Sequence, residues 1–442
     1  MTNGVGRKGF GFWLLLLLLI PVGNAWSQAL EINIVGGNPS ALPIAVVPFE
    51  YSGVSVSPDT DVAAVIRADL NRSGKFRGLP DQDIIEKPAR GADVNFATWR
   101  LLKQDFLVVG RVLDSGDGGY RVEYELFDVA RQERLAGFAL NGRPTAMRDV
   151  AHQIADQVYE KILGIRGAFW TRIAYVTASG TGRNINYALM IADADGYSPT
   201  TVVRSKEPLL SPAWSPDGRQ LAYVSFERGN SSIYLQELAT GQRQVLAAFK
   251  GINGAPAFSP DGQRLALTLS KGGNPDIYVM DLASRALTQI TRHWAIDTEP
   301  AWAADGQSIY FTSDRGGKPQ IYRVAAGGGD ASRVTFEGQY NARVTLCCDG
   351  KKLAMAQGNG NVYRIALLDQ SLGGPGLWSN LSPGSLDESP SFAPNGSMIL
   401  YAAREGTRGV LYAVSADARV RQRLVLADGD VREPAWSPYR QR

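Results

Sequence analysis

The sequence of 442 residues contains very little cysteine. Its two cysteines, Cys347 and Cys348, are adjacent, and neighbours on a strand point to opposite faces, so they do not readily join each other. We interpret them as two free thiols in a strand, with a strained vicinal disulfide as the alternative. In either case the fold does not depend on a disulfide framework.

Histidine is equally scarce, with His152 and His293 as the two examples. A metal site ligated by histidines is therefore nearly excluded. A Ser–His–Asp triad would need one of these two residues, and neither is accompanied by the G-x-S-x-G turn of the serine hydrolases. We therefore predict that the protein is not an enzyme and that it holds no cofactor or metal.

Long hydrophobic runs are absent apart from one near the N-terminus. Arg7 and Lys8 precede the apolar run Phe10–Val22, and small and polar residues follow as far as Ser27–Ala29. This order is typical of a secretory signal peptide. We predict cleavage after Ala29, with Ser27 as the alternative site. An uncleaved anchor is disfavoured, because a run of about 13 residues is shorter than the roughly 17–25 that a membrane span needs.

A large excess of charge of one sign is also missing. The formal net charge is only +3, and the basic residues are scattered, which excludes an obvious nucleic-acid surface. The composition, 44% hydrophobic and 20% charged, is ordinary for a soluble globular protein. The 48 glycines and 23 prolines favour many short strands joined by turns.

Residues 30–165 predict an α+β domain with a mixed sheet and helices. Apolar or alternating runs indicate strands, and helical spacing of apolar residues indicates helices. The strands are expected within Pro43–Phe49, Phe106–Leu113 and Tyr120–Ala130, and helices within Asp59–Phe76, Asn95–Asp105 and Met147–Ile165. The domain has no phosphate-binding glycine fingerprint.

Residues 166–442 contain a repeat of the type PAWSPDG. Its successive copies begin at Pro212, Pro256, Pro300, Val344, Pro390 and Pro434, in steps of 44, 44, 44, 46 and 44 residues. A period near 40–45 with strand-length apolar runs is the sequence sign of a β-propeller with one blade per repeat. An aromatic or bulky residue in each first strand is expected to fill the space between adjacent blades.

The last copy, PAWSPY, is cut off after its first strand. The first blade, which begins at Arg172–Ser179, has no such strand before it. The C-terminal strand therefore completes the first blade, closes the ring and sets the number of blades at six. We predict an all-β six-bladed propeller closed by the C-terminal strand.

The recurring aspartates of the repeat are interpreted as turn residues rather than as a catalytic or metal set, because they recur in almost every blade. They are Asp217, Asp261, Asp305 and Asp349. The loops on the opposite face vary in sequence, and variable loops on a rigid scaffold are a usual place for recognition. A binding platform is the function that this pattern favours.

Several features together resemble the TolB family, the periplasmic propeller proteins of the Tol–Pal system. They are the signal peptide, the domain order, the junction YEKILGIRGAFWTRIAYV, the six blades and the ending PAWSPY. The resemblance covers essentially the whole mature chain. It implies a periplasmic, non-enzymatic scaffold that supports outer-membrane integrity and constriction at cell division.

The resemblance also implies partners and sites. The lipoprotein Pal is expected at the propeller loops, through Ile252, Asn253, Ala255, Thr298 and Glu299. The family often has histidine where this chain has Ile252, so one polar contact is expected to be absent. TolA is expected at the N-terminal segment 30–37, through Leu30, Glu31, Ile32, Asn33, Ile34 and Val35, an apolar pattern that could add to a sheet edge of a partner.

The resemblance further implies a monomer that reaches the membrane only through Pal, TolA and other envelope proteins. The alternative hypothesis is a secreted propeller hydrolase or lyase that acts on peptides or sugars. That hypothesis requires a histidine or carboxylate cluster inside the channel, with His293 as the residue to test.

Overall fold

The computed structural model describes residues 34–35, 38–182, 184–424, 426 and 429–441. The expected signal peptide, residues 1–29, lies outside them. No helix within these ranges is long and apolar enough to cross a bilayer.

The first part of the described chain forms a mixed sheet, as predicted. Its order is β4-β2-β5-β6-β7, with β3 beside β5. The pairs β2–β4, β2–β5 and β3–β5 are parallel, whereas β5–β6 and β6–β7 are antiparallel. The strands are β2 (Leu42–Val46), β3 (Glu50–Tyr51), β4 (Phe76–Gly78), β5 (Phe106–Asp114), β6 (Tyr120–Asp128) and β7 (Glu133–Gly142).

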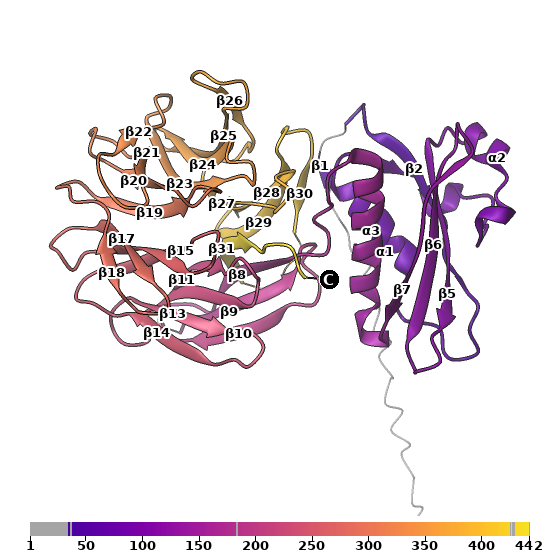
Figure 1. Ribbon diagram of the computed structural model, residues 1–442, viewed down its shortest axis with the longest axis horizontal. Helices are drawn as coiled ribbons and strands as arrows, with labels where there is room; N and C mark the ends of the chain where they lie inside the picture. The colour runs from indigo at the N-terminus through magenta and orange to yellow at the C-terminus, as the bar shows by residue number, and fades with distance from the viewer. Residues whose placement is uncertain (1–33, 36–37, 183, 425, 427–428, 442) are drawn as a thin grey trace, which may run out of the picture. The chain divides into compact units, whose positions relative to one another are not determined.

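Helices cover both faces of this sheet (Figure 1). The helices α1 (Val62–Arg72) and α3 (Met147–Leu163) pack together on one face, and α2 (Phe96–Leu101) lies on the other. Three single 3₁₀ turns, at Asp81–Asp83, Gly91–Asp93 and Pro144–Ala146, complete the helical segments. Asp61 begins α1 by accepting a hydrogen bond from the backbone N–H of Ala64, as an N-cap residue does.

The remaining described strands form six small antiparallel sheets arranged as the blades of a propeller, so the predicted fold is confirmed (Figure 1). Blade 1 contains β8 (Arg172–Ser179), β9 (Asn186–Asp193), β10 (Thr200–Ser205) and β31 (Asp430–Trp436). Blade 2 contains β11 (Leu209–Trp214), β12 (Gln220–Ser225), β13 (Ser232–Glu237) and β14 (Arg243–Ala247). Blade 3 contains β15 (Asn253–Phe258), β16 (Arg264–Leu269), β17 (Asp276–Asp281) and β18 (Leu287–Gln289).

The other three blades continue the order of the chain. Blade 4 contains β19 (Asp297–Trp302), β20 (Ser308–Ser313), β21 (Gln320–Ala325) and β22 (Ser332–Arg333). Blade 5 contains β23 (Tyr340–Leu346), β24 (Lys352–Asn359), β25 (Val362–Asp369) and β26 (Leu377–Asn380). Blade 6 contains β27 (Glu388–Phe392), β28 (Met398–Glu405), β29 (Arg408–Ser415) and β30 (Arg421–Arg423).

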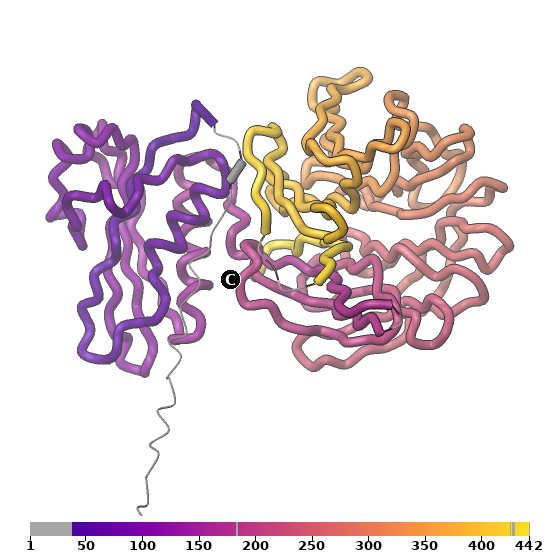
Figure 2. Tube along the Cα trace, turned by 180° about the vertical axis from the view of Figure 1, so that it is seen from behind, coloured from indigo at the N-terminus to yellow at the C-terminus, as the bar shows by residue number. Residues whose placement is uncertain are grey.

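The C-terminal strand closes the ring as the repeat count predicts. β31 pairs antiparallel with β8, and Figures 1 and 2 show this yellow strand beside the magenta strands of blade 1. The indole of Trp436 is buried and donates a hydrogen bond of 2.8 Å from Nε1 to Thr171 Oγ1. Residues from the two ends of the propeller sequence therefore share one sheet and one core.

Tryptophans in the first strands link neighbouring blades, as expected for that position. Trp214 Nε1 of blade 2 donates to the backbone oxygen of Ala435 in blade 1 over 3.1 Å, and Trp302 Nε1 of blade 4 donates to that of Ala257 in blade 3 over 3.0 Å. Each indole thus fills the gap between two sheets and satisfies its one polar atom.

Blade 6 has a fifth strand that the repeat does not predict. The short strand β1 (Ile34–Val35) pairs antiparallel with the outer strand β30, with Ile34 opposite Gln422 and Val35 opposite Arg421. The outer edge of a blade offers unpaired backbone groups, and an added strand satisfies them. These two residues therefore pair with an edge of the propeller.

The cysteines differ from the expectation. Both thiols are free, but strand β23 ends at Leu346, so Cys347 and Cys348 lie at the turn that follows. The backbone N–H of Gly350 donates to the carbonyl of Cys347, which closes that turn. The prediction of a strand position was wrong, because Cys347 and Cys348 occupy the positions that Ser and Pro take in the turns of blades 2 and 3.

Each first strand carries the same local distortion where it reaches the central channel. One residue per blade has a positive φ between 45° and 55°, and the pairing register of the strand shifts beside it. The six are Ser211, Ala255, Glu299, Arg343, Ser389 and Glu433. This β-bulge turns six side chains toward the channel, and residues in strained backbone conformations are often found at functional sites.

Candidate functional site

The residues expected to bind a partner lie on two neighbouring loops and strand starts of blades 3 and 4. Ile252 is exposed to 50%, whereas Ala255, Thr298 and Glu299 are half-buried where their strands enter the channel. The structure thus brings these four side chains to the loop face and its central opening.

Asn253 has a different position, because its side chain is completely buried. Its Nδ2 donates to the backbone oxygens of Phe249 over 2.7 Å and of Ser231 over 3.0 Å, and its Oδ1 accepts from the N–H of Phe249 over 2.9 Å. These bonds hold the loop in front of β15. Asn253 therefore positions Ile252 rather than presenting its own amide to solvent.

Exposed apolar side chains surround these residues, and the residue pattern alone did not single them out. Trp294 is exposed to 76%, and Phe249 and Ile296 are also exposed, as is the expected residue Ile252. All four belong to the loops that precede β15 and β19. Large apolar side chains on adjacent loops of a rigid scaffold are a usual signal of a protein-binding surface. The sequence signal was available, since Trp294 and Ile296 interrupt an otherwise polar loop.

His293 does not form a catalytic arrangement within the described residues. Its Nδ1 accepts a hydrogen bond of 3.1 Å from the backbone N–H of Ala295, and its ring lies 5.1 Å from that of Trp294. No ion pair joins its ring to a carboxylate in the described part of the chain. The imidazole therefore orders the loop that carries Trp294.

A charged ring fills the central channel. Arg343 Nε lies 2.9 Å from Glu299 Oε1, and Arg343 Nη1 lies 3.0 Å from Glu433 Oε1 and contacts Ser389 Oγ. The backbone N–H of Ser211 donates to Glu433 Oε2 over 3.0 Å. Side chains from four blades and a backbone N–H from a fifth thus meet at a cavity of about 170 Å³.

Electrostatics in this ring favour the charged form of the arginine. Burial alone would lower the pKa of Arg343, but the carboxylates of Glu433 and Glu299 outweigh it and raise that pKa. Two carboxylates share one guanidinium, so the three groups have a net charge of −1. Because Glu299 is also one of the residues expected to bind Pal, the ring includes part of the expected partner site.

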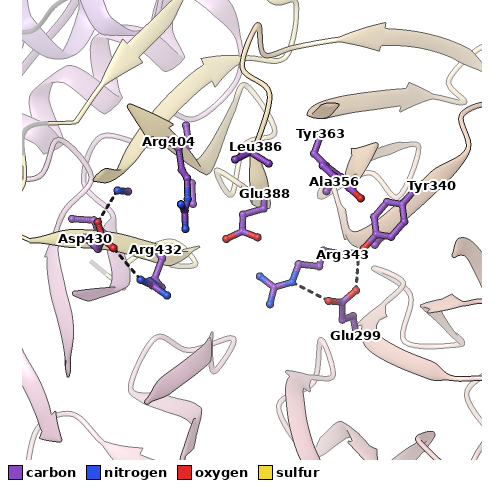
Figure 3. A pocket seen from close by; sticks show the side chains of 15 residues that line it. Glu299, Tyr340, Arg343, Ala356, Tyr363, Leu386, Glu388, Arg404, Asp430 and Arg432 are labelled. Atoms are coloured by element: carbon purple, nitrogen blue, oxygen red, sulfur yellow. Dashed lines mark hydrogen bonds and ion pairs between the residues drawn. The ribbon is translucent and has the colours of Figure 1, made fainter. Parts of the chain in front are cut away.

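A larger cavity of about 560 Å³ opens beside the ring, between blades 5, 6 and 1 (Figure 3). The view shows Arg343 and Glu299 at one side of it, Arg404 and Arg432 at the other, and Glu388 between them. None of the residues expected from the sequence lines it except Glu299.

A third polar cluster lies away from the loop face and includes the other histidine. His152 Nδ1 is 2.6 Å from Asp69 Oδ2, and His152 Nε2 is 3.9 Å from Asp195 Oδ2, with all three residues buried. Their ligand atoms lie within 4.8 Å of one another, a spacing that a metal ion could bridge. However, Arg72 already pairs with Asp69 over 3.0 Å, and Arg148 pairs with Asp195 over 2.5 Å. These cations disfavour a metal.

A protonated His152 suits this cluster better than a metal ion does. Burial lowers the pKa of His152, but Asp69 and Asp195 outweigh the burial and raise it. Burial raises the pKa of Asp195, whereas His152, Arg72 and Arg148 together lower it below its ordinary value. The arrangement is therefore an ion-pair network that joins α1, α3 and the turn after β9. The sequence did not indicate that Asp69, His152 and Asp195 lie together, because they are far apart in the chain.

The segment expected to bind TolA falls partly outside the described residues. Leu30, Glu31, Ile32 and Asn33 lie outside them, and Ile34–Val35 form β1 on the edge of blade 6. The strand-like character expected of the segment is present in those two residues.

Comparisons with known proteins agree with this architecture. The model of the TolB β-propeller domain matches residues 159–440, and that of the TolB amino-terminal domain matches residues 30–135. The chain belongs to the TolB family. The fold and the family predicted from the sequence are thereby confirmed.

The relatives in this family are close and match over nearly their full length. The Tol-Pal system protein TolB of Xanthomonas campestris pv. campestris (strain B100) is 73% identical over 97% of this chain and 98% of its own. The protein of that name in Xanthomonas oryzae pv. oryzae (strain PXO99A) has the same identity and coverage. A crystal structure of TolB from Acinetobacter baumannii is 42% identical and covers 93% of this chain and 100% of its own, with a TM-score of 0.84.

Proposed function

We propose that this TolB-family chain is a non-enzymatic scaffold of the Tol–Pal system. In this proposal it binds the lipoprotein Pal through the propeller loop face and TolA through its N-terminal segment. It acts in the periplasm after removal of residues 1–29, and supports outer-membrane integrity and constriction during cell division. The observation that carries the proposal is the 73% identity, over nearly the whole chain, to proteins named for this system.

The chemistry of the loop face supports a protein partner. Ile252 and Trp294 supply exposed apolar area, and the buried amide of Asn253 holds the loop beneath Ile252. Ala255 and Thr298 lie where the loops descend into the channel, so a partner that covers the apolar residues also approaches these two. A rigid backbone with apolar anchors lowers the entropic cost of binding.

The position of β1 supports a partner that captures an extended segment. Ile34 and Val35 already pair as a strand with β30, so the same backbone groups can pair with the edge of another sheet only after they leave this one. Binding of TolA to Leu30, Glu31, Ile32, Asn33, Ile34 and Val35 would therefore compete with the docking of β1. In the proposal, Pal binding at the loop face shifts this equilibrium.

The test is a binding measurement between the full mature chain and purified Pal by isothermal titration calorimetry. Ala255→Arg and Thr298→Arg each place a large cation in the opening and are expected to weaken binding at least about tenfold. Ala283→Arg is the matched control, because Ala283 is exposed in a turn on the opposite face of blade 3. Wild-type affinity in both loop-face variants would contradict the assigned site.

A second measurement tests the N-terminal segment. Removal of residues 30–37 should abolish TolA binding and leave Pal binding measurable. It should also speed amide hydrogen exchange at Arg421–Arg423, because β30 loses its outer neighbour. The outer strand β26 of blade 5 is the internal control. Unchanged TolA binding after the deletion would place that partner elsewhere.

A further inference from the structure

The turn that joins β23 to β24 in blade 5 carries both cysteines of the sequence. The backbone N–H of Cys347 donates to the carbonyl of Lys352, and that of Gly350 donates to the carbonyl of Cys347, each over 2.9 Å. Neighbours on a strand point to opposite faces, but this turn brings the two side chains together. The Sγ atoms of Cys347 and Cys348 lie 3.6 Å apart. The two thiols therefore form a pair that one ligand can contact at once.

The neighbouring blade leaves room for this pair. Gly396 lies in the turn after β27 of blade 6, and a Cβ there would overlap the Cys347 sulfur and lie 3.8 Å from the Cys348 sulfur. Both sulfurs thus lie beside the same glycine, whose missing side chain makes space for them. Cys347 is buried, whereas Cys348 is exposed. A small ion can therefore reach the pair from solvent through Cys348.

The separation of the two sulfurs suits a tetrahedral metal ion. Thiolate sulfurs bind zinc at about 2.3 Å, so two of them on one tetrahedral ion lie roughly 3.8 Å apart, close to the 3.6 Å between these two. A disulfide suits the pair less well. Consecutive Cα atoms are about 3.8 Å apart, whereas a disulfide usually joins Cα atoms roughly 4.4–6.8 Å apart. The pair therefore needs little movement to hold a metal ion.

We propose that Cys347 and Cys348 form a binding site for a thiophilic divalent cation of the zinc and cadmium class. Both thiols lose their protons to solvent as the ion binds, so two thiolates balance its double positive charge. Soft thiolate ligands select such an ion over magnesium or calcium, which prefer oxygen ligands. In the described ranges no carboxylate or imidazole lies within 4.8 Å of both sulfurs, so water completes the coordination.

The site is separate from the surface assigned to Pal. β23 starts at the loop face with Tyr340 and ends at Leu346, so the turn that follows it lies on the opposite face of the propeller. The metal site therefore does not depend on the binding of Pal or TolA.

Blade 2 shows the same turn without thiols. Ser215 and Pro216 take the places of Cys347 and Cys348 there. The Oγ of Ser215 accepts a hydrogen bond of 2.9 Å from the backbone N–H of Gln220. Cys347→Ser and Cys348→Pro therefore each introduce a residue that this turn already accepts elsewhere in the ring, and both variants are expected to fold.

The test is a titration of the full mature chain with cadmium chloride, with the thiols reduced, the reductant removed and oxygen excluded. Charge transfer from thiolate to cadmium absorbs in the ultraviolet and reports sulfur ligation directly, and native mass spectrometry counts the bound ions. We expect one ion per chain, which excess magnesium does not displace. Because the sequence has no other cysteine, the absorption can arise only from this pair.

Two variants distinguish a site made by both sulfurs from a single thiol. Cys347→Ser keeps the exposed Cys348 and Cys348→Pro keeps Cys347, and each should bind cadmium at least about tenfold more weakly than the wild-type chain. Asp305→Asn, at an exposed turn position of blade 4, is the control for carboxylates and should leave the affinity unchanged. Circular dichroism and melting temperature confirm that each variant is folded.

Three results would overturn the proposal. The first is the absence of the charge-transfer absorption when both thiols are reduced. The second is wild-type affinity in Cys347→Ser, which would show binding by a lone surface thiol only. The third is displacement of the ion by excess magnesium, which would show a site without preference for a thiophilic cation.

Discussion

The guanidinium of Arg343 lies 3.0 Å from the carboxylate of Glu433, although 90 residues separate them in the chain. Arg343 belongs to blade 5 and Glu433 to the C-terminal strand in blade 1, so their ion pair crosses the channel. Glu299 of blade 4 completes the set. The closure of the ring thus has an electrostatic component at its centre in addition to the strand pairing at its edge.

Arg343→Met should destabilise the protein by about 2 kcal/mol, because it leaves the buried carboxylate of Glu433 and the half-buried carboxylate of Glu299 without their shared cation. Urea unfolding measures the change, and Arg228→Met is the control for loss of an exposed arginine. Equal stability of the two variants would show that the ring adds nothing beyond the strand pairing.

Deletion of residues 433–442 should open the ring. It removes most of β31 and the buried Trp436, and leaves β8 with an unpaired edge. We expect a melting temperature lower by roughly 5 °C or more, with aggregation on heating. Deletion of residues 440–442 alone is the control, because it removes the ion pair of Arg440 with Asp149 and keeps the strand. A melting temperature that does not change on the longer deletion would contradict the closure.

Stability should fall as pH rises from about 4 to 6.5, in part because of Asp156. Its side chain is buried, which raises the pKa to about 6 from the ordinary 3.8. The folded protein therefore binds a proton in this range that the unfolded chain has released, and its free energy of unfolding falls by up to roughly 3 kcal/mol. His152, whose pKa is also raised, adds a loss of the same sign above about 6.5.

Asp156→Asn tests this account, because the amide oxygen can still accept the hydrogen bond from the N–H of Phe169. We expect a smaller decrease in the free energy of unfolding between pH 4.5 and 6.5, measured in urea. The exposed Asp93→Asn is the control. A decrease as large as that of the wild-type protein would assign the pH dependence to other groups.

The two cysteines should react at very different rates. Burial raises the pKa of the Cys347 thiol to about 12, and the neighbouring Cys348 adds to that effect, so little thiolate forms. Cys348 is exposed. Peptide mapping by mass spectrometry after brief treatment with iodoacetamide should find the label on Cys348. In Cys348→Ser the remaining thiol should react only after unfolding, and prompt labelling of Cys347 would contradict its burial.

Part of the candidate functional site could be predicted from the sequence, and part could not. The loops before β15 and β19 vary within a regular repeat, which pointed to a binding face, and the resemblance to the TolB family pointed to Ile252 and Thr298 on it. The burial of Asn253 was not visible, because it depends on the carbonyls of Phe249 and Ser231. The turn position of the cysteines was missed, although the aligned Ser–Pro of blades 2 and 3 occupies the same place.

The sequence by itself determined the blades, their number and the way the ring closes. Apolar–polar alternation along strands, Asp–Gly turns and one unmatched first strand are local signals. They can be recognised without knowledge of the fold. Only the tertiary structure decided which charges meet, because Glu299, Arg343 and Glu433 converge through backbone bulges and closure across 44 and 90 residues. It also decided that Arg404 and Glu388 line one cavity beside Arg343, since that depends on two longer hairpins that lie next to each other.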